Sequence, residues 1–141
     1  MQSQVTRYGY ALRLDTGEEI VAALARFATE HDLRAGLISG IGAVGETELG
    51  FFVRATGTYT TRVFTGEHEI GVLTGNFSEL DDRPFPHCHA VIAGEDMVAH
   101  TGHLFRGVVT VTCEVQIVTD PGVLRRLRSP DLGFHPLELG T

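Results

Sequence analysis

The chain has 141 residues and a mass of 15.3 kDa, which suits one domain with a substantial core, so we expect a single domain over residues 1–141. Hydrophobic residues make up 43% of the chain, which excludes a disordered protein, and no apolar run is long enough to span a membrane. The formal net charge is −7 and all 11 basic residues are arginine, which argues against DNA binding by the chain alone and excludes Schiff-base chemistry on lysine.

The N-terminal residues lack the charged and then apolar order of a signal peptide, so we expect a cytoplasmic protein. The two cysteines, Cys88 and Cys113, lie in strand-like apolar surroundings. Buried free thiols are therefore expected there rather than a disulfide.

The first elements predicted along the chain are a strand and a helix. Apolar and small residues alternate from Val5 to Asp15, which is the period of a half-buried strand. Thr16 and Glu19 have the spacing of a capping box, and an apolar stripe at helical spacing follows over residues 20–28. We expect this helix to end near His31.

The next predicted elements are strands. Ala35–Ala43 reads as a buried strand, and Gly40–Gly45 matches the G-x-G-x-x-G pattern of dinucleotide-binding proteins. That motif requires a helix directly after the glycines, whereas residues 46–57 are typical of another strand, so the glycines favour a bulge or tight turn. Further strands are expected at Thr58–Phe64 and Ile70–Phe77, followed by a polar loop at Ser78–Arg83.

The stretch from Pro84 to Leu104 holds four of the seven histidines. His87 and His89 are one residue apart in a predicted strand, so both imidazoles should leave the same face, about 6.6 Å apart along the chain. After a turn at residues 94–96 the chain should return antiparallel and bring His103 beside them.

Three imidazole nitrogens plus water form an open zinc site, and neutral imidazole also suits iron, copper or nickel. His87, His89 and His103 are thus the predicted ligands of zinc or another divalent transition metal. His100 and Cys88 should point to the opposite face because of their odd spacing. The alternative is that the histidines are ordinary hydrogen-bonded residues of the sheet.

The longest predicted strand runs from Phe105 to Ile117 and alternates cleanly. It places His103 on the apolar side if no bulge intervenes at Gly107, so the cluster should lie in a pocket at the end of the core. Pro121–Arg128 is predicted to be a short helix, with Arg125, Arg126 and Arg128 on its solvated face. The remaining tail should pack through three apolar residues, Leu132, Phe134 and Leu137.

These elements predict an α+β fold, in which a mainly antiparallel sheet of about six strands carries one principal flanking helix and a short C-terminal helix. The predicted strand around His87 is apolar on both sides, so a subunit interface is expected to cover part of the sheet.

A metal-dependent hydrolase is the alternative function, in which a metal-bound water is the nucleophile and a carboxylate is the base. Glu114 and Glu95 are the candidate catalytic residues. Glu95 follows the H-x-H pair as in the cupin motif, although the gap is too long by at least one residue. For Glu114 the sequence favours an exposed strand carboxylate that faces away from His103 by parity. The sequence favours a protein that is not an enzyme.

Nearly the whole chain resembles the plants and prokaryotes conserved (PPC) domain, which follows AT-hooks in plant nuclear proteins and stands alone in bacteria and archaea. No single motif is specific to this family, but the order and spacing of the motifs together are. The matching segments are LRLDTGEEI, GLISGIGAVGETELGFF, VLTGNFS, PFPHCH, GHL and TCEV, which ends near Glu114.

The resemblance implies an antiparallel sheet with flanking helices, assembly as a homotrimer, and a metal, usually zinc, at histidines matching His87, His89 and His103. Plant members bind AT-rich DNA through the AT-hook and use the PPC domain for self-association and partner contacts. This chain has no Arg-Gly-Arg-Pro core, and the plant partner-binding motif aligns on residues 66–71 without its arginine and phenylalanine. A protein partner remains an expectation, and membrane binding is not expected. DNA binding is not expected of the isolated chain; as a second alternative function it would require a positive surface assembled from arginines of several subunits of the trimer.

Overall fold

Alternating apolar and polar residues build one nine-stranded sheet in the computed structural model, which describes residues 1–129 and 132–140. A single α-helix accompanies the sheet in these residues, so the predicted α+β class is confirmed. The elements are β1 (Gln2–Thr6), β2 (Gly9–Asp15), α1 (Ile20–Glu30), β3 (Gly36–Val53), β4 (Thr58–Phe64), β5 (His68–Leu80), β6 (Arg83–Ala93), β7 (Ala99–Thr119), β8 (Arg125–Arg126) and β9 (Leu137–Glu138).

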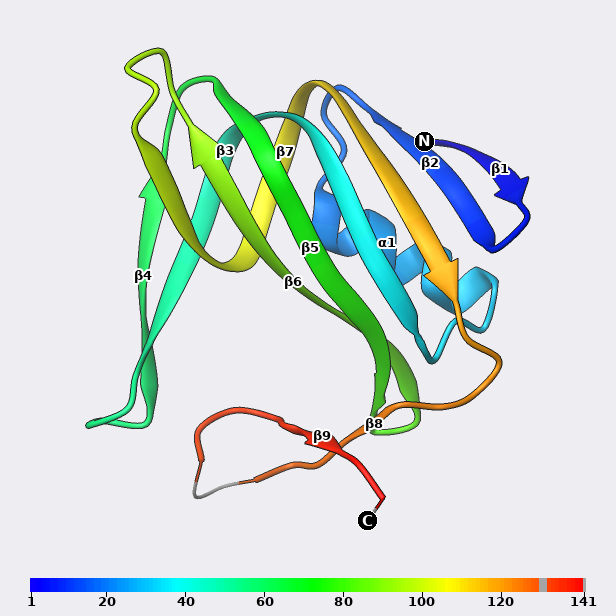
Figure 1. Cartoon of the computed structure of the whole chain (residues 1–141). Helices are drawn as coiled ribbons and strands as arrows, with labels where there is room; N and C mark the ends of the chain where they lie inside the picture. Colours follow the sequence, from blue (N-terminus) through cyan, green and yellow to red (C-terminus); the bar gives the residue numbers. More distant parts are fainter. Residues whose placement is uncertain (130–131, 141) are drawn as a thin grey trace.

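Four of the strands close into a ring of antiparallel pairs. β3 pairs with both β5 and β7, and β6 pairs with the same two strands. β2 and β1 extend the sheet from β7, whereas β4 extends it from β3. The short strands β8 and β9 lie across the lower end of β5 and β6 (Figure 1).

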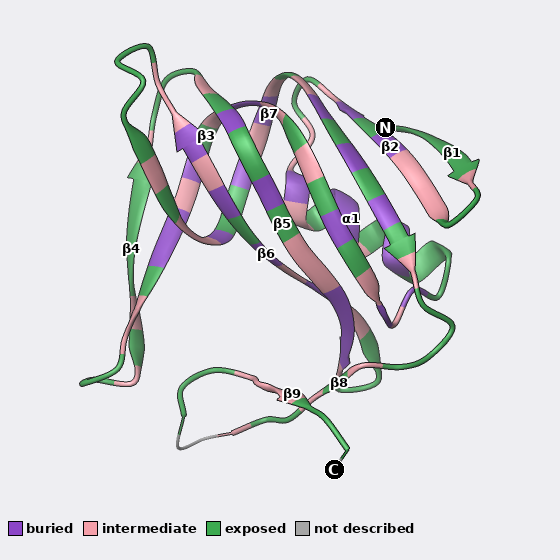
Figure 2. Cartoon of the chain, viewed as in Figure 1, coloured by how far each residue is buried: buried purple, intermediate pink, exposed green. Residues whose placement is uncertain are grey.

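The hydrophobic core lies between α1 and the inner face of the strands. Ile20, Leu24 and Phe27 of α1 are fully buried, and the helix packs on β6 and β7. Buried residues recur along β3, β5 and β7 between exposed ones (Figure 2), and over residues 113–118 of β7 every second side chain enters the core. Cys88 and Cys113 are free thiols inside this core, as predicted.

The start of α1 differs from the predicted capping box. Thr16 donates its hydroxyl to the carbonyls of Thr110 and Val111, at 3.0 Å each, and does not cap the helix. Glu19 is the cap residue, because its carboxylate accepts the backbone N–H groups of Val21 and Ala22. The predicted end of the helix near His31 is confirmed.

Several strand boundaries also differ from the prediction. The first predicted strand is a hairpin of β1 and β2, and the two strands expected on either side of Gly40–Gly45 are one continuous β3 with a register shift between Gly40 and Gly42. The predicted loop at Ser78–Arg83 is a tight turn at Asp81 and Asp82, both of which have positive φ.

The predicted helix at Pro121–Arg128 is wrong. Arg125 instead forms a bridge with Glu79 at the end of β5, and Arg125 and Arg126 pair with β9. The nearly buried carboxylate of Glu79 accepts from Arg34 and from Arg125 Nε. This long-range ion pairing holds the segment in an extended form, which helical periodicity could not reveal.

Bulges in β7 also change the predicted side of His103. The pairing of β3 with β7 shifts register three times, between Gly42 and Val44, between Val44 and Thr47, and between Glu48 and Leu49. His103 therefore lies on the face opposite the core residues Cys113 and Val115.

Among the described residues, no helix has the length and apolar character that crossing a membrane requires.

Replacing Glu19 with alanine should lower the free energy of unfolding by about 1–2 kcal/mol, because the start of α1 loses its cap. Glu19 also accepts the backbone N–H of Gly107 at 3.0 Å, so the same change loosens a bulge in β7. Urea denaturation measures the loss, and Glu30→Ala at the exposed end of α1 is the control. A loss in Glu19→Ala no larger than in the control would contradict this role.

Candidate metal centre

The hairpin of β6 and β7 brings the three predicted histidines together. His89 and His103 are direct partners across the two strands, and His87 lies two residues before His89 on the same face. One nitrogen from each of the three imidazoles lies within 4.8 Å of the other two. His89 is exposed, whereas His87 and His103 are half-buried.

Hydrogen bonds fix the tautomers of the two half-buried rings. Arg126 Nη2 lies 3.0 Å from His87 Nδ1, and a guanidinium can only donate, so His87 Nδ1 is the acceptor. The proton of the neutral His87 ring is therefore on Nε2, which donates to His103 Nδ1 at 3.1 Å. Both rings are thus held in one orientation before any ligand binds.

The surroundings keep these rings uncharged. Burial lowers the pKa of His87 to about 4, with further contributions from Arg126, His103 and His89. Burial also lowers the pKa of His103 to about 4, helped by His89 and Arg126. Neutral imidazole is the form that binds a metal, so neither ring has to lose a charge at physiological pH; His103 Nδ1 offers a lone pair, whereas His87 Nε2 would have to give up its proton to coordinate.

The donor set fits a tetrahedral transition metal. Two nitrogens bonded to one zinc ion at about 2.0–2.1 Å lie about 3.3 Å apart, close to the 3.1 Å between His87 Nε2 and His103 Nδ1. Exposed His89 would complete three protein ligands and leave the fourth position open. A bound metal would act as a Lewis acid and lower the pKa of a coordinated water.

A pocket of about 220 Å³ opens beside the cluster. Its walls are mainly aromatic, and it is lined by Tyr59, Phe85, His87, His103, Phe105, Arg126, Gly133, Phe134 and His135. Gly50, the partner of His103 on β3, makes room for two of these rings because a Cβ there would collide with Phe105 and press on Tyr59. Apolar walls beside polar groups are typical of a site for a small ligand.

Arg126 is the residue that links the cluster to the C-terminal segment. Its guanidinium donates to Ser78 Oγ at 2.8 Å, to Asn76 Oδ1 at 2.8 Å and to the backbone carbonyl of His135 at 2.7 Å. It also lies over the ring of Phe85. Every one of these partners is electrically neutral.

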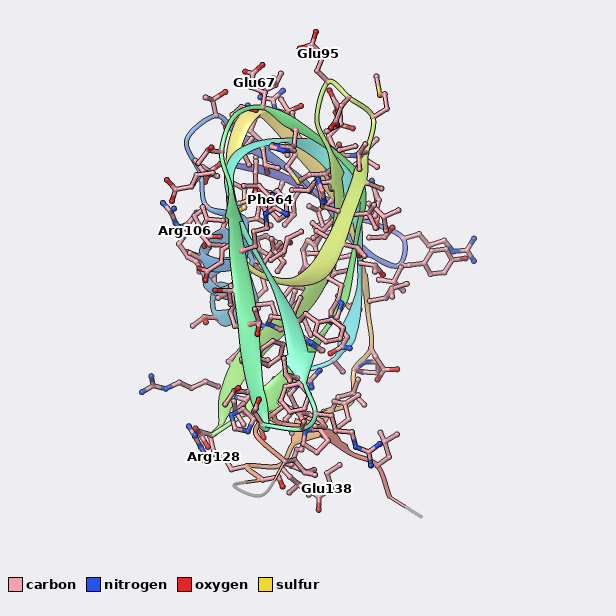
Figure 3. All side chains as sticks on the ribbon, turned by 90° about the vertical axis from the view of Figure 1, so that its left-hand side faces the viewer. Phe64, Glu67, Glu95, Arg106, Arg128 and Glu138 are labelled. Atoms are coloured by element: carbon pink, nitrogen blue, oxygen red, sulfur yellow. The ribbon has the colours of Figure 1, made fainter. Side chains whose placement is uncertain are left out.

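The other candidate residues lie away from the three histidines. Glu95 is exposed in the turn between β6 and β7, at the end of the molecule opposite Arg128 and Glu138 (Figure 3). Glu114 is exposed on β7 and lines a separate polar depression with Arg13 and Gln116, among others. Neither carboxylate lines the histidine pocket, so the geometry gives no support to either as a general base.

His100 and Cys88 are oriented as predicted. His100 packs against Phe64 with 4.6 Å between ring centroids, and it is opposite buried Ile92 rather than beside His103. Cys88 faces the core, where burial raises the pKa of its thiol to about 12. Neither contributes to the cluster.

The sequence interpretation missed the pocket walls and Arg126. The prediction of a solvated face for Arg125, Arg126 and Arg128 is wrong for Arg126, which is half-buried against His87. Phe134 was expected to pack as part of the tail, and it contacts Phe52 with 5.2 Å between ring centroids. Adjacent residues of a strand face opposite sides, so only the assignment of this segment as extended would have shown that Arg125 and Arg126 point in different directions.

Fold and cluster together define a class of small α+β proteins with three imidazoles on the outer face of a closed strand ring. Residues 1–120 match the Plants and Prokaryotes Conserved (PCC) domain model. The chain therefore belongs to this family, which is the one its motifs resemble. No curated protein matched the chain.

Solved structures of similar proteins support the same family. The chain is 31% identical to a proposed DNA-binding protein from Bacteroides thetaiotaomicron, over 97% of this chain and 96% of that one, with a TM-score of 0.93. It is 31% identical to a metal-containing protein from Archaeoglobus fulgidus, over 98% and 97%, with a TM-score of 0.87. A plant- and prokaryote-conserved protein from Pyrococcus horikoshii is 25% identical over 99% and 96%, with a TM-score of 0.86.

The lowered pKa values of His87 and His103 predict a pH-dependent stability of the metal-free protein. In the unfolded chain these histidines take up protons near pH 6.5, whereas in the folded protein they do so only near pH 4. The unfolded chain binds more protons between these values, so stability should fall as the pH drops from about 6.5 to 4.

Urea denaturation of metal-free protein across this pH range measures the effect. A variant with His87→Asn and His103→Asn should lose less stability than the wild type over the same range, because carboxylates titrate in both proteins and cancel in the comparison. Equal losses in the two proteins would contradict the assignment.

Proposed function

We propose that the protein is a homotrimeric PPC-domain protein in which His87, His89 and His103 hold zinc or another divalent transition metal, with a regulatory or partner-binding role. The observation that carries the proposal is the convergence of three imidazole nitrogens within 4.8 Å of one another. The description of the similar Archaeoglobus fulgidus protein as metal-containing supports it.

The preferred ion follows from the donor atoms. Three neutral imidazoles suit zinc, iron, copper or nickel, and magnesium and calcium prefer oxygen ligands. Zinc is the first choice because the 3.1 Å separation of His87 Nε2 and His103 Nδ1 fits a tetrahedral site. The free thiols of Cys88 and Cys113 suit a reducing compartment such as the cytoplasm.

A binding role is favoured over catalysis and over DNA binding. Glu95 and Glu114 do not line the histidine pocket, so neither is placed to act as the carboxylate base that a hydrolase needs beside a metal-bound water. The similar Bacteroides thetaiotaomicron protein is described as a proposed DNA-binding protein, but the net charge of −7 opposes phosphate binding by this chain.

Exposed aliphatic side chains support the proposed assembly. Leu37 and Val118 are partners across β3 and β7, and they are 53% and 47% exposed. Ile41 on β3 and Val72 on β5 are 60% and 46% exposed. Such a group on one sheet face is typical of a protein interface, and we propose that further copies of the chain cover it.

Metal analysis tests the proposed centre. Protein purified without an affinity tag, stripped with a chelator and titrated with zinc should bind about one ion per chain and melt at a higher temperature when loaded. His89→Ala removes an exposed ligand and should weaken zinc binding on the order of 100-fold or more.

His100→Ala is the matched control, because this histidine lies on the same hairpin but outside the cluster, and its zinc affinity should equal that of the wild type. Failure to bind zinc stoichiometrically, together with unchanged stability in chelator, would overturn the proposal.

Light scattering coupled to size exclusion tests the assembly. The wild type should have three times the 15.3 kDa mass of the chain. Ile41→Glu places a charge in the proposed interface and should give monomers, whereas Met97→Glu in the exposed turn after β6 should leave the mass unchanged. A monomeric wild type, or an unaffected Ile41→Glu variant, would contradict the assembly.

A further inference from the structure

Arg126 combines burial with the lack of a charged partner. Its side chain is half-buried, and its guanidinium donates only to neutral groups, among them His87 Nδ1. No carboxylate of the described residues forms an ion pair with it, whereas its neighbours Arg125 and Arg128 bind Glu79 and Asp81. An arginine withdrawn from water normally has such a partner, so within the described residues this positive charge is met only by neutral acceptors.

The charge faces the histidine pocket. Arg126 lines the pocket beside His87 and His103, and no acidic side chain is among the described residues that line it. His135, another of these residues, has a buried Nδ1 with no hydrogen-bond partner in the described structure. Arg126 is therefore the charged group that a ligand in the pocket would meet.

The walls restrict what the ligand's body can be. Tyr59 and Phe105 pack edge to face with 5.1 Å between centroids, and Phe105 packs against His103 at 4.5 Å. Phe134, from the C-terminal segment, also lines the pocket and packs on Phe52, which in turn packs on Tyr59. The volume of about 220 Å³ is below the roughly 300–1,000 Å³ of pockets for drug-sized molecules, so the ligand is small, with a flat apolar body.

Metal binding would strengthen the case for an anion. If His87 coordinated a metal through Nε2, its ring proton would be on Nδ1. The N–H groups of His87 Nδ1 and Arg126 Nη2 would then face each other, and two donors cannot share a hydrogen bond. Arg126 would have to release His87, and the Nδ1–H of His87 would need a new acceptor. An anionic oxygen in the pocket satisfies this donor and compensates the buried charge.

We propose that the pocket binds a small planar carboxylate, with its anionic group at Arg126 beside the histidine cluster and its apolar body between Tyr59, Phe105 and Phe134. The carboxylate's contact with Arg126 is independent of the metal. Its second contact, with the Nδ1–H of His87, rests on the proposed metal centre. The sequence matched by the family model ends at residue 120, so Arg126 and Phe134 lie beyond it.

Titration calorimetry with benzoate tests the assignment on the full chain, both metal-free and zinc-loaded. Benzamide has the same shape without the charge and should bind on the order of tenfold more weakly. Arg126→Gln should weaken benzoate binding at least tenfold in both forms, and Arg126→Lys should recover part of it. Phe134→Ala, which keeps the charge, should also weaken benzoate binding.

Arg128→Gln is the control, because it alters an exposed arginine of the same segment that binds Asp81, and its benzoate affinity should equal that of the wild type. Thermal melting of each variant checks that it is folded. Equal binding of benzoate and benzamide, or no binding of benzoate in either form, would overturn the proposal.

Benzoate binding that needs zinc and survives Arg126→Gln would assign the anion to the metal alone and overturn the role of Arg126. A protein that takes up no zinc would overturn the metal centre, and the metal-free titration would then still decide the role of Arg126.

Discussion

The double pairing of β7, with β3 along one edge and with β6 along the other, is the constraint on which the site depends. It closes the strand ring and sets the register in which His103 faces His89. Because one residue of slip would turn an imidazole to the other face, the register of β6 and β7 decides whether the cluster exists. The bulges of β7 let the strand serve this outer cluster at one end and the core at the other.

The fold class and the histidine cluster were predictable because both depend on local periodicity. His87 and His89 share a face in any regular strand, and a short hairpin brings His103 back beside them. The side of the sheet was not predictable, because it depends on bulges at which β3 and β7 shift register. The C-terminal segment was misassigned as a helix because its extended form depends on Glu79, more than 40 residues away in sequence.

The chemistry of the pocket is set by a contrast between two kinds of arginine. Arg125 and Arg128 are exposed to solvent, which screens their charge, and each lies on a carboxylate, that of nearly buried Glu79 and that of exposed Asp81. Arg126, between them in the chain, turns inward to neutral acceptors. Sequence composition could not distinguish the three, since burial and partner choice follow from the pairing of β8 with β5 and β9.

The two halves of the pocket come from separate parts of the chain. The histidines belong to the closed strand ring, where every change is coupled to the core, whereas Arg126 and Phe134 belong to a peripheral segment held by a few ion pairs and by Gly133, which is packed tightly on Gly57. Substitution of Phe134 can therefore alter the wall of the pocket and leave the hydrogen bonds of the imidazoles in place, whereas substitution of Arg126 also releases His87 Nδ1. The aromatic wall that would contact a ligand's body and the rings that would hold a metal can thus be varied separately by mutation.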